Sequence, residues 1–371
     1  MANIILGCSL GFLIYTYLLY PMVIGFMAKW FGKSVTKKMP EESPDITVVL
    51  CVFNSEDVIQ SRIENIFALD YPAEKLKIIV VADGCTDKTC EQVELSDFRH
   101  VKLVRYENNR GKSYALSKAL EHVGTDLILF ADVRQRFAVD VLQQMVPYFN
   151  DENVGAVTGN LQIEESGGDP GLYWRYEKAI RKCESEYLSL VGVTGAIYMA
   201  QAKLMPVFPV DIVLDDMYGP LTIIKQNYRV VYCEQAHAFD NGSHTLREEF
   251  DRKVRTLAGN YQLFQILPWT LNPFKNPVFF EFFSHKVCRL LVPYFIISLF
   301  VSSAFSANWF GIFMFYSQLF FYVLTLLFYV YFYKKKGKTN FILSFMMLNL
   351  AALKAGVVYW TGSTSSIWKK H

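Results

Sequence analysis

A long uncharged apolar segment near the N-terminus limits what this chain can fold into. No charged residue occurs from Ile4 to Ala28, and a helix over such a segment can cross a bilayer, which takes about 20 apolar residues. The start lacks the basic region and cleavage site of a signal peptide, so we expect the helix to be retained. Lys29, Lys33, Lys37 and Lys38 follow directly. Because positive charge stays on the cytoplasmic side, we expect the N-terminus outside and residue 30 onward inside.

The last third of the chain repeats this pattern. Val287–Phe305 and Trp309–Tyr333 are apolar segments joined by a very short turn, and Lys334–Lys336 and Lys338 follow the second. This arrangement predicts a membrane hairpin whose second segment ends inside.

A third apolar segment in this region gives two conflicting signals. Phe341–Trp360 is interrupted by Lys354. If it spans, the C-terminus lies outside, whereas the ending Trp368–Lys370 is typical of an inside, interfacial position. A span and a surface helix therefore both stay open. Before the hairpin, Tyr261–Phe283 is rich in aromatic residues and proline, which predicts a segment that lies in the membrane interface.

The composition fits a membrane protein that carries one folded soluble domain. Hydrophobic residues make up 52% and charged residues 19% of the chain, against about 25% charged residues in a typical soluble domain. The formal net charge of +2 argues against nucleic acid as a partner, because phosphate binding needs a concentrated excess of lysine and arginine. The 7 cysteines are scattered, without a CxxC pair, which indicates a reducing compartment and no structural zinc.

The middle of the chain, from Pro40 to about Phe264, alternates between apolar β-branched runs and helical segments. The expected strands are Ile46–Phe53, Lys77–Asp83, Val101–Tyr106 and Asp126–Asp132, and the expected helices are Ser55–Leu69, Thr86–Leu95 and Gly111–Val123. Such alternation predicts βαβ units and a mostly parallel sheet covered on both faces. Ligands of such sheets bind beyond the carboxyl ends of the strands.

Two of these strands end in a carboxylate, Asp83 and Asp132. A single aspartate at such a position often caps the next helix, and Asp87 fits that role as well as a binding role. Two carboxylates at the same edge of the sheet indicate a ligand-binding site. The chain has neither the GxGxxG fingerprint nor a P-loop, so a bound diphosphate would be held by a carboxylate-bound metal and by lysine or arginine.

Seven short motifs, in order along the chain, resemble the family 2 glycosyltransferases with a GT-A fold. They are Val52–Glu56 (VFNSE), Asp83–Asp87 (DGCTD), Asn109–Lys112 (NRGK), Phe130–Asp132 (FAD), Thr194–Ala196 (TGA), Leu214–Asp216 (LDD) and Arg252–Arg255 (RKVR). The membrane-embedded branch of this family, which includes cellulose, chitin and hyaluronan synthases, is similar in placing transmembrane helices after the catalytic domain.

The resemblance implies an enzyme that uses a UDP-sugar. It implies that Asp83 binds the uracil, that Asn54, Glu56, Asp87 and Lys112 help to hold the nucleotide, and that Asp132 binds a divalent cation, Mn²⁺ or Mg²⁺, which bridges the phosphates. It also implies that Asp216 is the general base, with a pKa raised by Asp215, and that Arg252 and Arg255, on one helix face, neutralise the leaving diphosphate. The structural alternatives are an acidic first turn of a helix and a basic helix that faces lipid headgroups.

The chain departs from the family pattern at two motifs. The DxD motif reads Asp132-Val133-Arg134, so its second acid is missing. Asp216, Asp240 or His244 would have to supply another ligand, or Arg134 or Arg136 would replace part of the cation's charge. The QxxRW motif of the processive synthases corresponds to Arg252–Thr256, which lacks the tryptophan that stacks on the acceptor. The aromatic residues that could stack instead are Tyr173, Trp174, Tyr261 and Trp269.

We therefore expect an α/β GT-A fold, Rossmann-like with a mixed, mostly parallel sheet. The expected parts are an N-terminal transmembrane helix (1–29), a GT-A domain (40–264), an interfacial segment (265–285) and C-terminal transmembrane helices (286–371). The expected function is an inverting glycosyltransferase of the hexosyltransferase class in the plasma membrane, with its catalytic domain in the cytoplasm. A polysaccharide and a lipid-linked acceptor both stay open, as do a homo-oligomer and an export partner. The alternative is a non-catalytic nucleotide-sugar-binding subunit of a polysaccharide synthesis or export complex.

Overall fold

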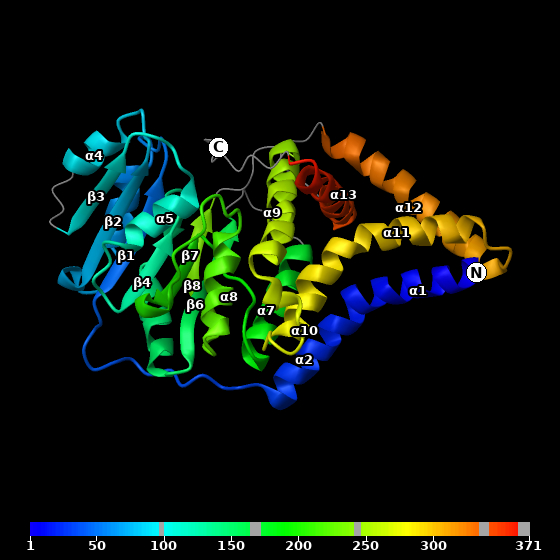
Figure 1. Cartoon of the computed structure of the whole chain (residues 1–371), viewed down its shortest axis with the longest axis horizontal. Helices are drawn as coiled ribbons and strands as arrows, with labels where there is room; N and C mark the ends of the chain where they lie inside the picture. The colour runs from blue at the N-terminus through cyan, green and yellow to red at the C-terminus, as the bar shows by residue number, and fades with distance from the viewer. Residues whose placement is uncertain (96–99, 164–171, 241–245, 334–340, 363–371) are drawn as a thin grey trace.

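The computed structural model describes residues 1–95, 100–163, 172–240, 246–333 and 341–362. An α/β domain built on one sheet lies at one end of the molecule, and long apolar helices lie at the other (Figure 1). Helix α9 (Leu246–Ile266) stands between the two parts.

In the described part of the chain, the sheet has eight strands in the order β3-β2-β1-β4-β7-β6-β8-β5. Strands β1 to β4 pair in parallel, β7 is antiparallel to both of its neighbours, β6 and β8 are parallel, and β5 is antiparallel to β8. The predicted mixed, mostly parallel sheet is therefore confirmed. The strand bounds are β1 Ile46–Val52, β2 Leu76–Asp83, β3 Val101–Tyr106, β4 Leu127–Ala131, β5 Arg136–Phe137, β6 Val154–Ile163, β7 Ile197–Gln201 and β8 Arg229–Asp240.

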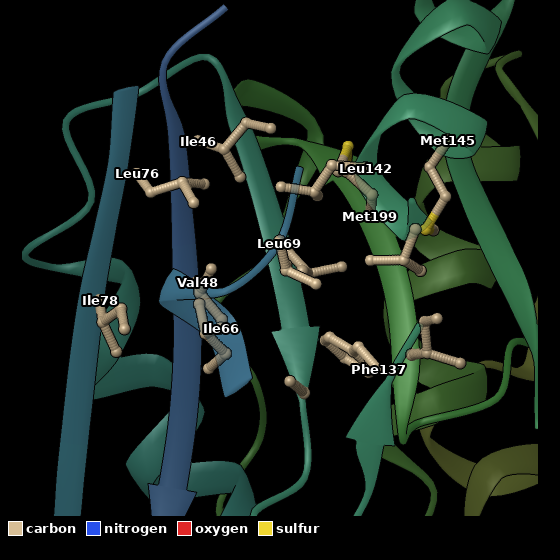
Figure 2. Packing of buried hydrophobic residues seen from close by; sticks show 14 of the residues in the cluster. Ile46, Val48, Ile66, Leu69, Leu76, Ile78, Phe137, Leu142, Met145 and Met199 are labelled. Carbon is tan, nitrogen blue, oxygen red and sulfur yellow. The ribbon is translucent and has the colours of Figure 1, made fainter. Parts of the chain in front are cut away.

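Helices cover both faces of this sheet. The bounds of the helices in the α/β domain are α3 Ile59–Phe67, α4 Thr89–Leu95, α5 Lys112–Leu120, α6 Val141–Met145, α7 Leu172–Tyr187 and α8 Asp215–Lys225. Figure 2 shows one core, in which Ile66 and Leu69, within and just after α3, lie against Val48 of β1. Helices α5 and α8 pack on the opposite face. Strand β1 is buried along its whole length, as expected of a central strand in a doubly covered sheet.

The first helix of the domain begins later than the sequence predicts. We expected a helix from Ser55, but α3 starts at Ile59. The backbone amides of Ser55 and Glu56 donate hydrogen bonds to the side chains of Thr89 and Asp87, and Asn54 adopts a positive φ of 47°. The segment after β1 is therefore a loop that is bonded to the loop after β2.

Among the described residues, four helical stretches are long and apolar enough to cross a membrane: Ala2–Phe31, Phe279–Ala304, Trp309–Tyr331 and Phe341–Trp360. The first consists of α1 Ala2–Ile14, the π-helical turn Tyr15–Leu19 and α2 Tyr20–Phe31, and the second of α10 Phe279–Phe282, the π-helical turn Phe283–Val287 and α11 Cys288–Ala304. The others lie in α12 Trp309–Tyr333 and α13 Phe341–Trp360. These helices give the chain a membrane localisation.

The N-terminal span packs against the hairpin. The rings of Phe12 and Phe295 stack at 3.8 Å, and the Ser9 hydroxyl donates to Ser298 Oγ at 3.0 Å. At the end of the bundle farthest from the sheet, the Ser306 hydroxyl donates to Asn3 Oδ1 (Figure 1). Segments from the two ends of the chain therefore form one bundle.

A buried polar cluster joins this bundle to helix α7 of the α/β domain. Glu184 accepts hydrogen bonds from the Tyr20 hydroxyl at 2.5 Å and from His285 Nδ1 at 2.6 Å. Glu177 contacts His285 Nε2 at 3.1 Å and forms an ion pair with Arg289. Burial on its own would raise the pKa of both glutamates. The effect of Arg289 and His285 on Glu177, and of His285 and Tyr20 on Glu184, outweighs burial, so the pKa of each glutamate is lowered. Helix α7 is thereby tied to both the first and the second span.

Candidate active site

Four segments meet at the carboxyl edge of the parallel strands: the loops after β1, β2 and β4, and the start of α5. The start of α8 joins them through Lys112, which contacts both Asp132 and Asp215. The sheet register explains this convergence, because Ile46 of β1 is paired with Leu76 of β2 and Leu127 of β4. The strands therefore end side by side, as ligand-binding edges of open α/β sheets do.

The loops after β1 and β2 form one hydrogen-bonded wall. Asn54 Oδ1 accepts from the Thr86 amide at 2.8 Å, and Glu56 Oε2 accepts from the Lys88 amide at 2.9 Å. Asp87 accepts from the amides of Glu56 and Thr89. The structure thus brings together Asn54, Glu56 and Asp87 and gives Asp87 the helix-capping role as well as a place in the wall.

Asp83 lies beneath the loop that precedes α5. Its side chain is fully buried, and its two carboxylate oxygens accept the amide hydrogens of Arg110 and Gly111 at 2.7 and 2.8 Å. The next residue, Gly84, has a φ of +67°, and a Cβ there would lie 2.4 Å from the Asn109 nitrogen. Only glycine allows the two loops to approach so closely.

Lys112 lies at the centre of the acidic residues. Its ammonium nitrogen is 3.0 Å from Asp132 Oδ1 and 3.3 Å from Asp215 Oδ2. Burial disfavours the charge on this lysine, but Asp132 and Asp215 outweigh it and raise the pKa of Lys112 well above its usual value. Lys112 is therefore a permanently charged group beside both carboxylates.

Asp216, in the first turn of α8, is a carboxyl group whose pKa is raised by its surroundings. Burial, with the negative charge of Asp215 as the second cause, raises the pKa of Asp216 to about 6, although Lys112 acts in the opposite direction. A carboxylate with such a pKa is ionised at neutral pH and can still accept a proton efficiently. The prediction that Asp215 raises the pKa of its neighbour agrees with this arrangement.

Gly195 leaves space beside that carboxylate. A Cβ at this position would lie 3.5 Å from Asp216 Cβ and 3.7 Å from Lys112 Nζ. The Asp216 carbonyl accepts the Val193 amide at 2.9 Å, and the Thr194 amide donates to Thr158 Oγ1 at 2.9 Å. The Thr194–Ala196 motif is therefore held next to Asp216, and Gly195 places no side chain against the Asp216 side chain.

Asp132 is the expected metal ligand. The described residues contain no group of three or more His, Cys, Asp or Glu side chains that could hold a metal ion. Mg²⁺ is usually held by one or two carboxylates together with substrate phosphates. Asp132, half-exposed at the sheet edge, fits such a donor set. Of the other ligands considered, Asp240 accepts a hydrogen bond from Gln135, and His244 lies outside the described residues.

Arg252 and Arg255 lie on α9 and are both exposed. The described residues include no ion pair between either of them and the carboxylates at the sheet edge. The structure therefore places them on one helix, as expected, and does not bring them to Lys112 and Asp132. Arg134 is exposed, and Arg136 lies over the ring of Phe239 at 4.6 Å.

The four aromatic residues considered for acceptor stacking lie in different surroundings. Tyr261 stacks on Tyr359 of α13 at 5.5 Å, and Lys225, at the far end of α8, lies 5.9 Å from the Trp269 ring. Tyr173 and Trp174 lie on α7.

One residue on α7 that the sequence interpretation missed lies nearer to the site. Arg181 donates to Thr194 Oγ1 at 3.0 Å, in the loop beside Asp216. An arginine in an amphipathic helix carries no sequence signal that separates it from a surface residue. The contact depends on how α7 packs against the loop before β7.

Comparison with known proteins shows which family model and which proteins this chain is similar to. Residues 47–202 match the model of glycosyl transferase family 2. A poly-beta-1,6-N-acetyl-D-glucosamine synthase of Staphylococcus aureus (strain MSSA476) is 26% identical over 266 residues, which are 65% of this chain and 62% of that protein. The protein of the same name from Staphylococcus epidermidis is 23% identical over 246 residues, covering 63% and 59%. The chain thus spans about three-fifths of the length of these curated relatives.

A solved structure is similar over nearly the whole chain. The mannosyltransferase PcManGT from Pyrobaculum calidifontis, in complex with GDP-Man and Mn²⁺, has a TM-score of 0.75 and 20% sequence identity, covering 96% of this chain and 99% of that one. This similarity shows the fold and confirms the predicted GT-A-like α/β class. The motif resemblance is confirmed as well, because residues 47–202, which contain five of the seven motifs whole, match the model of glycosyl transferase family 2.

Proposed function

We propose that this chain is a membrane-bound, inverting glycosyltransferase that transfers a sugar from a UDP-sugar to a polysaccharide or lipid-linked acceptor, with Asp216 as the general base. The observation that carries the proposal is the surroundings of Asp216: a carboxyl group with a pKa of about 6 next to the Lys112–Asp132–Asp215 cluster at the sheet edge. Its expected location is the plasma membrane, with the domain on the cytoplasmic side where the lysine clusters lie.

In the proposed reaction, an acceptor hydroxyl attacks the anomeric carbon of the donor. Asp216 takes the hydroxyl proton, the new C–O bond forms, and the bond from the anomeric carbon to the diphosphate oxygen breaks, so UDP leaves with that electron pair. Attack from the side opposite the leaving group inverts the anomeric centre and gives a β-linkage from an α-linked donor. Burial, and after it the negative charge of Asp215, keep the pKa of Asp216 high enough for this proton transfer.

The leaving diphosphate needs positive charge in the proposed site. Lys112 supplies one fixed charge beside Asp132, and fixed charges directed at a developing anion are typically worth about 10²–10³ in rate. A Mn²⁺ or Mg²⁺ ion held by Asp132 and the phosphates would add further charge compensation when bound. Arg252 and Arg255 on α9 form no ion pair with this cluster among the described residues, so the proposal that they neutralise the diphosphate rests on the motif resemblance.

The proposed nucleotide-binding surface is the wall formed by Asn54, Glu56 and Asp87. Asp83 lies buried beside this wall. Both Asp83 oxygens already accept backbone amide hydrogens. A carboxylate oxygen has a second lone pair, but the Asp83 side chain is fully buried, so a uracil contact requires the Arg110–Gly111 loop to move. The proposed roles of Asp83 are therefore to hold this loop and, once the loop has moved, to bind the base.

The test compares Asp216→Asn with Asp126→Asn, a matched control at an exposed position outside the site. We expect Asp216→Asn to lower UDP release from a UDP-sugar by roughly 1,000-fold while UDP binding stays within about a factor of three, and Asp126→Asn to behave like the wild type. Full activity of Asp216→Asn would remove this residue from the mechanism.

A second function, a non-catalytic nucleotide-sugar-binding subunit, is favoured by one observation. The second acid of the DxD motif is replaced by Arg134, and Lys112 already contacts Asp132. This alternative predicts UDP binding without UDP release for the wild type, with any of a panel of UDP- and GDP-sugars. Measurable release with one donor contradicts it.

Product length separates the two proposed acceptors. Purified full-length protein is given one active sugar nucleotide, and its products are separated by size. A ladder of polymers supports the polysaccharide acceptor, in line with the curated relatives, and addition of a single sugar to extractable lipid supports the lipid-linked acceptor.

A further inference from the structure

The loop that leads into Asp215 and Asp216 is held from outside the sheet by helix α9. The Val213 amide donates to Gln262 Oε1 at 2.9 Å, and Gln262 Nε2 donates to the Asp211 carbonyl at 3.0 Å. One side-chain amide therefore bridges two backbone groups of this loop. Asp211 adopts a positive φ of 62°, a conformation that needs support from its surroundings because it is uncommon for residues other than glycine.

Helix α9 also touches the same loop directly. A Cβ at Gly259 would lie 2.8 Å from Leu214 Cγ and 3.0 Å from Val213 Cγ1. Leu214 caps α8, since its carbonyl accepts the amides of Met217 and Tyr218. The first turn of α8, which carries the base, is therefore packed against α9 through the residue before it.

The other side of α9 rests on the apolar helix α13 (Figure 1). Val254 and Ala258 of α9 are buried in one cluster with Ala351 and Ala355 of α13. The rings of Tyr261 and Tyr359 stack a little farther along at 5.5 Å. Small residues allow two helices to approach closely, so α9 has little freedom to move independently of α13.

We propose that Gln262 is a positioning residue for the base, and that α13 supports the catalytic loop through α9. This inference rests on the proposed role of Asp216. The Gln262 bridge keeps Asp211–Val213 in one conformation and thereby fixes the first turn of α8. The C-terminal apolar helix is then a structural part of the active site as well as a membrane segment.

The first test compares Gln262→Ala and Gln262→Met with Gln265→Ala in the full-length protein. Gln265 lies three residues further along α9 and is exposed, so it controls for helix propensity and membrane extraction. Methionine keeps the volume of Gln262 and removes both hydrogen bonds. We expect both Gln262 variants to lose about tenfold in kcat, because small misplacements of a reacting group have large effects on rate. The KM for the donor should stay within twofold.

The pH profile separates positioning from loss of fold. If the loop loosens, water reaches Asp216, its pKa falls towards the ordinary value, and the acid limb of kcat moves to lower pH than in the wild type. Wild-type kcat and an unmoved acid limb in both Gln262 variants would overturn the inference.

The second test addresses α13. Ala355→Leu places a larger side chain in the fully buried α9–α13 contact, and Val357→Leu places it at a position that is 63% exposed. We expect Ala355→Leu to reproduce the loss of kcat and the shifted acid limb, and Val357→Leu to match the wild type. Equal behaviour of the two variants would overturn the role of α13. Turnover by Asp216→Asn would instead contradict the proposed function itself, so the two failures are distinguishable.

Discussion

The Lys112 ammonium lies 3.0 Å from Asp132 Oδ1 and connects the start of α5 to the end of β4. It also lowers the pKa of Asp216 relative to what burial and Asp215 alone would give. Lys112→Met therefore removes a charge from the proposed diphosphate site and raises the pKa of Asp216, the proposed base. We expect kcat at neutral pH to fall roughly 100-fold.

The same variant has a second readout. The acid limb of its pH–rate profile should lie at higher pH than that of the wild type, because the proposed base Asp216 has to be ionised to accept a proton. Lys118→Met is the matched control, since Lys118 lies on the same helix and pairs with Glu121 on the surface. An acid limb unchanged by Lys112→Met would contradict the electrostatic coupling of these residues.

Asp83 is expected to matter for stability as well as for nucleotide binding. Asp83→Asn replaces one acceptor oxygen with an amide that faces the N–H of Arg110 or Gly111. A buried unpaired donor costs about 1–3 kcal/mol, so the free energy of unfolding should fall by that amount and UDP should bind more weakly. Asp126→Asn, at an exposed position, is the control in chemical denaturation, and equal stability of the two variants would argue against this role.

The sequence was sufficient to predict where four strands of the sheet lie along the chain, the two strand-terminal aspartates and the acidic pair at the start of α8. Continuous apolar runs and residues at strand ends are local signals. Contacts between distant segments leave no local signal in the sequence. The hydrogen bond between Gln262 and Val213 and the one from Arg181 to Thr194 could therefore not be predicted. The late start of α3 has the same origin, because the Ser55 amide bonds to Thr89 in another loop.

Removal of divalent cations tests the proposed role of Asp132. In excess chelator we expect sugar transfer to fall at least tenfold and to return when Mn²⁺ or Mg²⁺ is added. Asp132→Asn should raise the cation concentration needed for half-maximal activity, because a carboxylate is a better ligand for these ions than an amide. Full activity in excess chelator would mean that Lys112 and the arginines carry the diphosphate charge without a metal.

Glu184 is expected to hold the α/β domain on the membrane helices. Glu184→Ala leaves the Tyr20 hydroxyl and His285 without their buried acceptor, and loss of one partner from such a site costs about 3 kcal/mol. Because the pKa of Glu184 is lowered in the fold, its contribution is complete above the ordinary glutamate pKa of about 4.3. It is lost as the pH falls below that value through the folded pKa.

Thermal unfolding in detergent measures this effect. Glu186→Ala, at an exposed position on the same helix, should unfold like the wild type. The difference between Glu184→Ala and the wild type should shrink as the pH falls below about 4. A difference that stays constant down to the lowest accessible pH would show that the Glu184 charge does not contribute.

The pH dependence of kcat at saturating donor and acceptor tests the central claim, that Asp216 is the base. With a pKa of about 6, Asp216 is protonated as the pH falls through 6, so the rate of sugar transfer should be half-maximal near that pH, and Asp216→Asn should show almost no turnover at any pH. A wild-type acid limb near pH 4, or the same profile in Asp216→Asn, would contradict the claim.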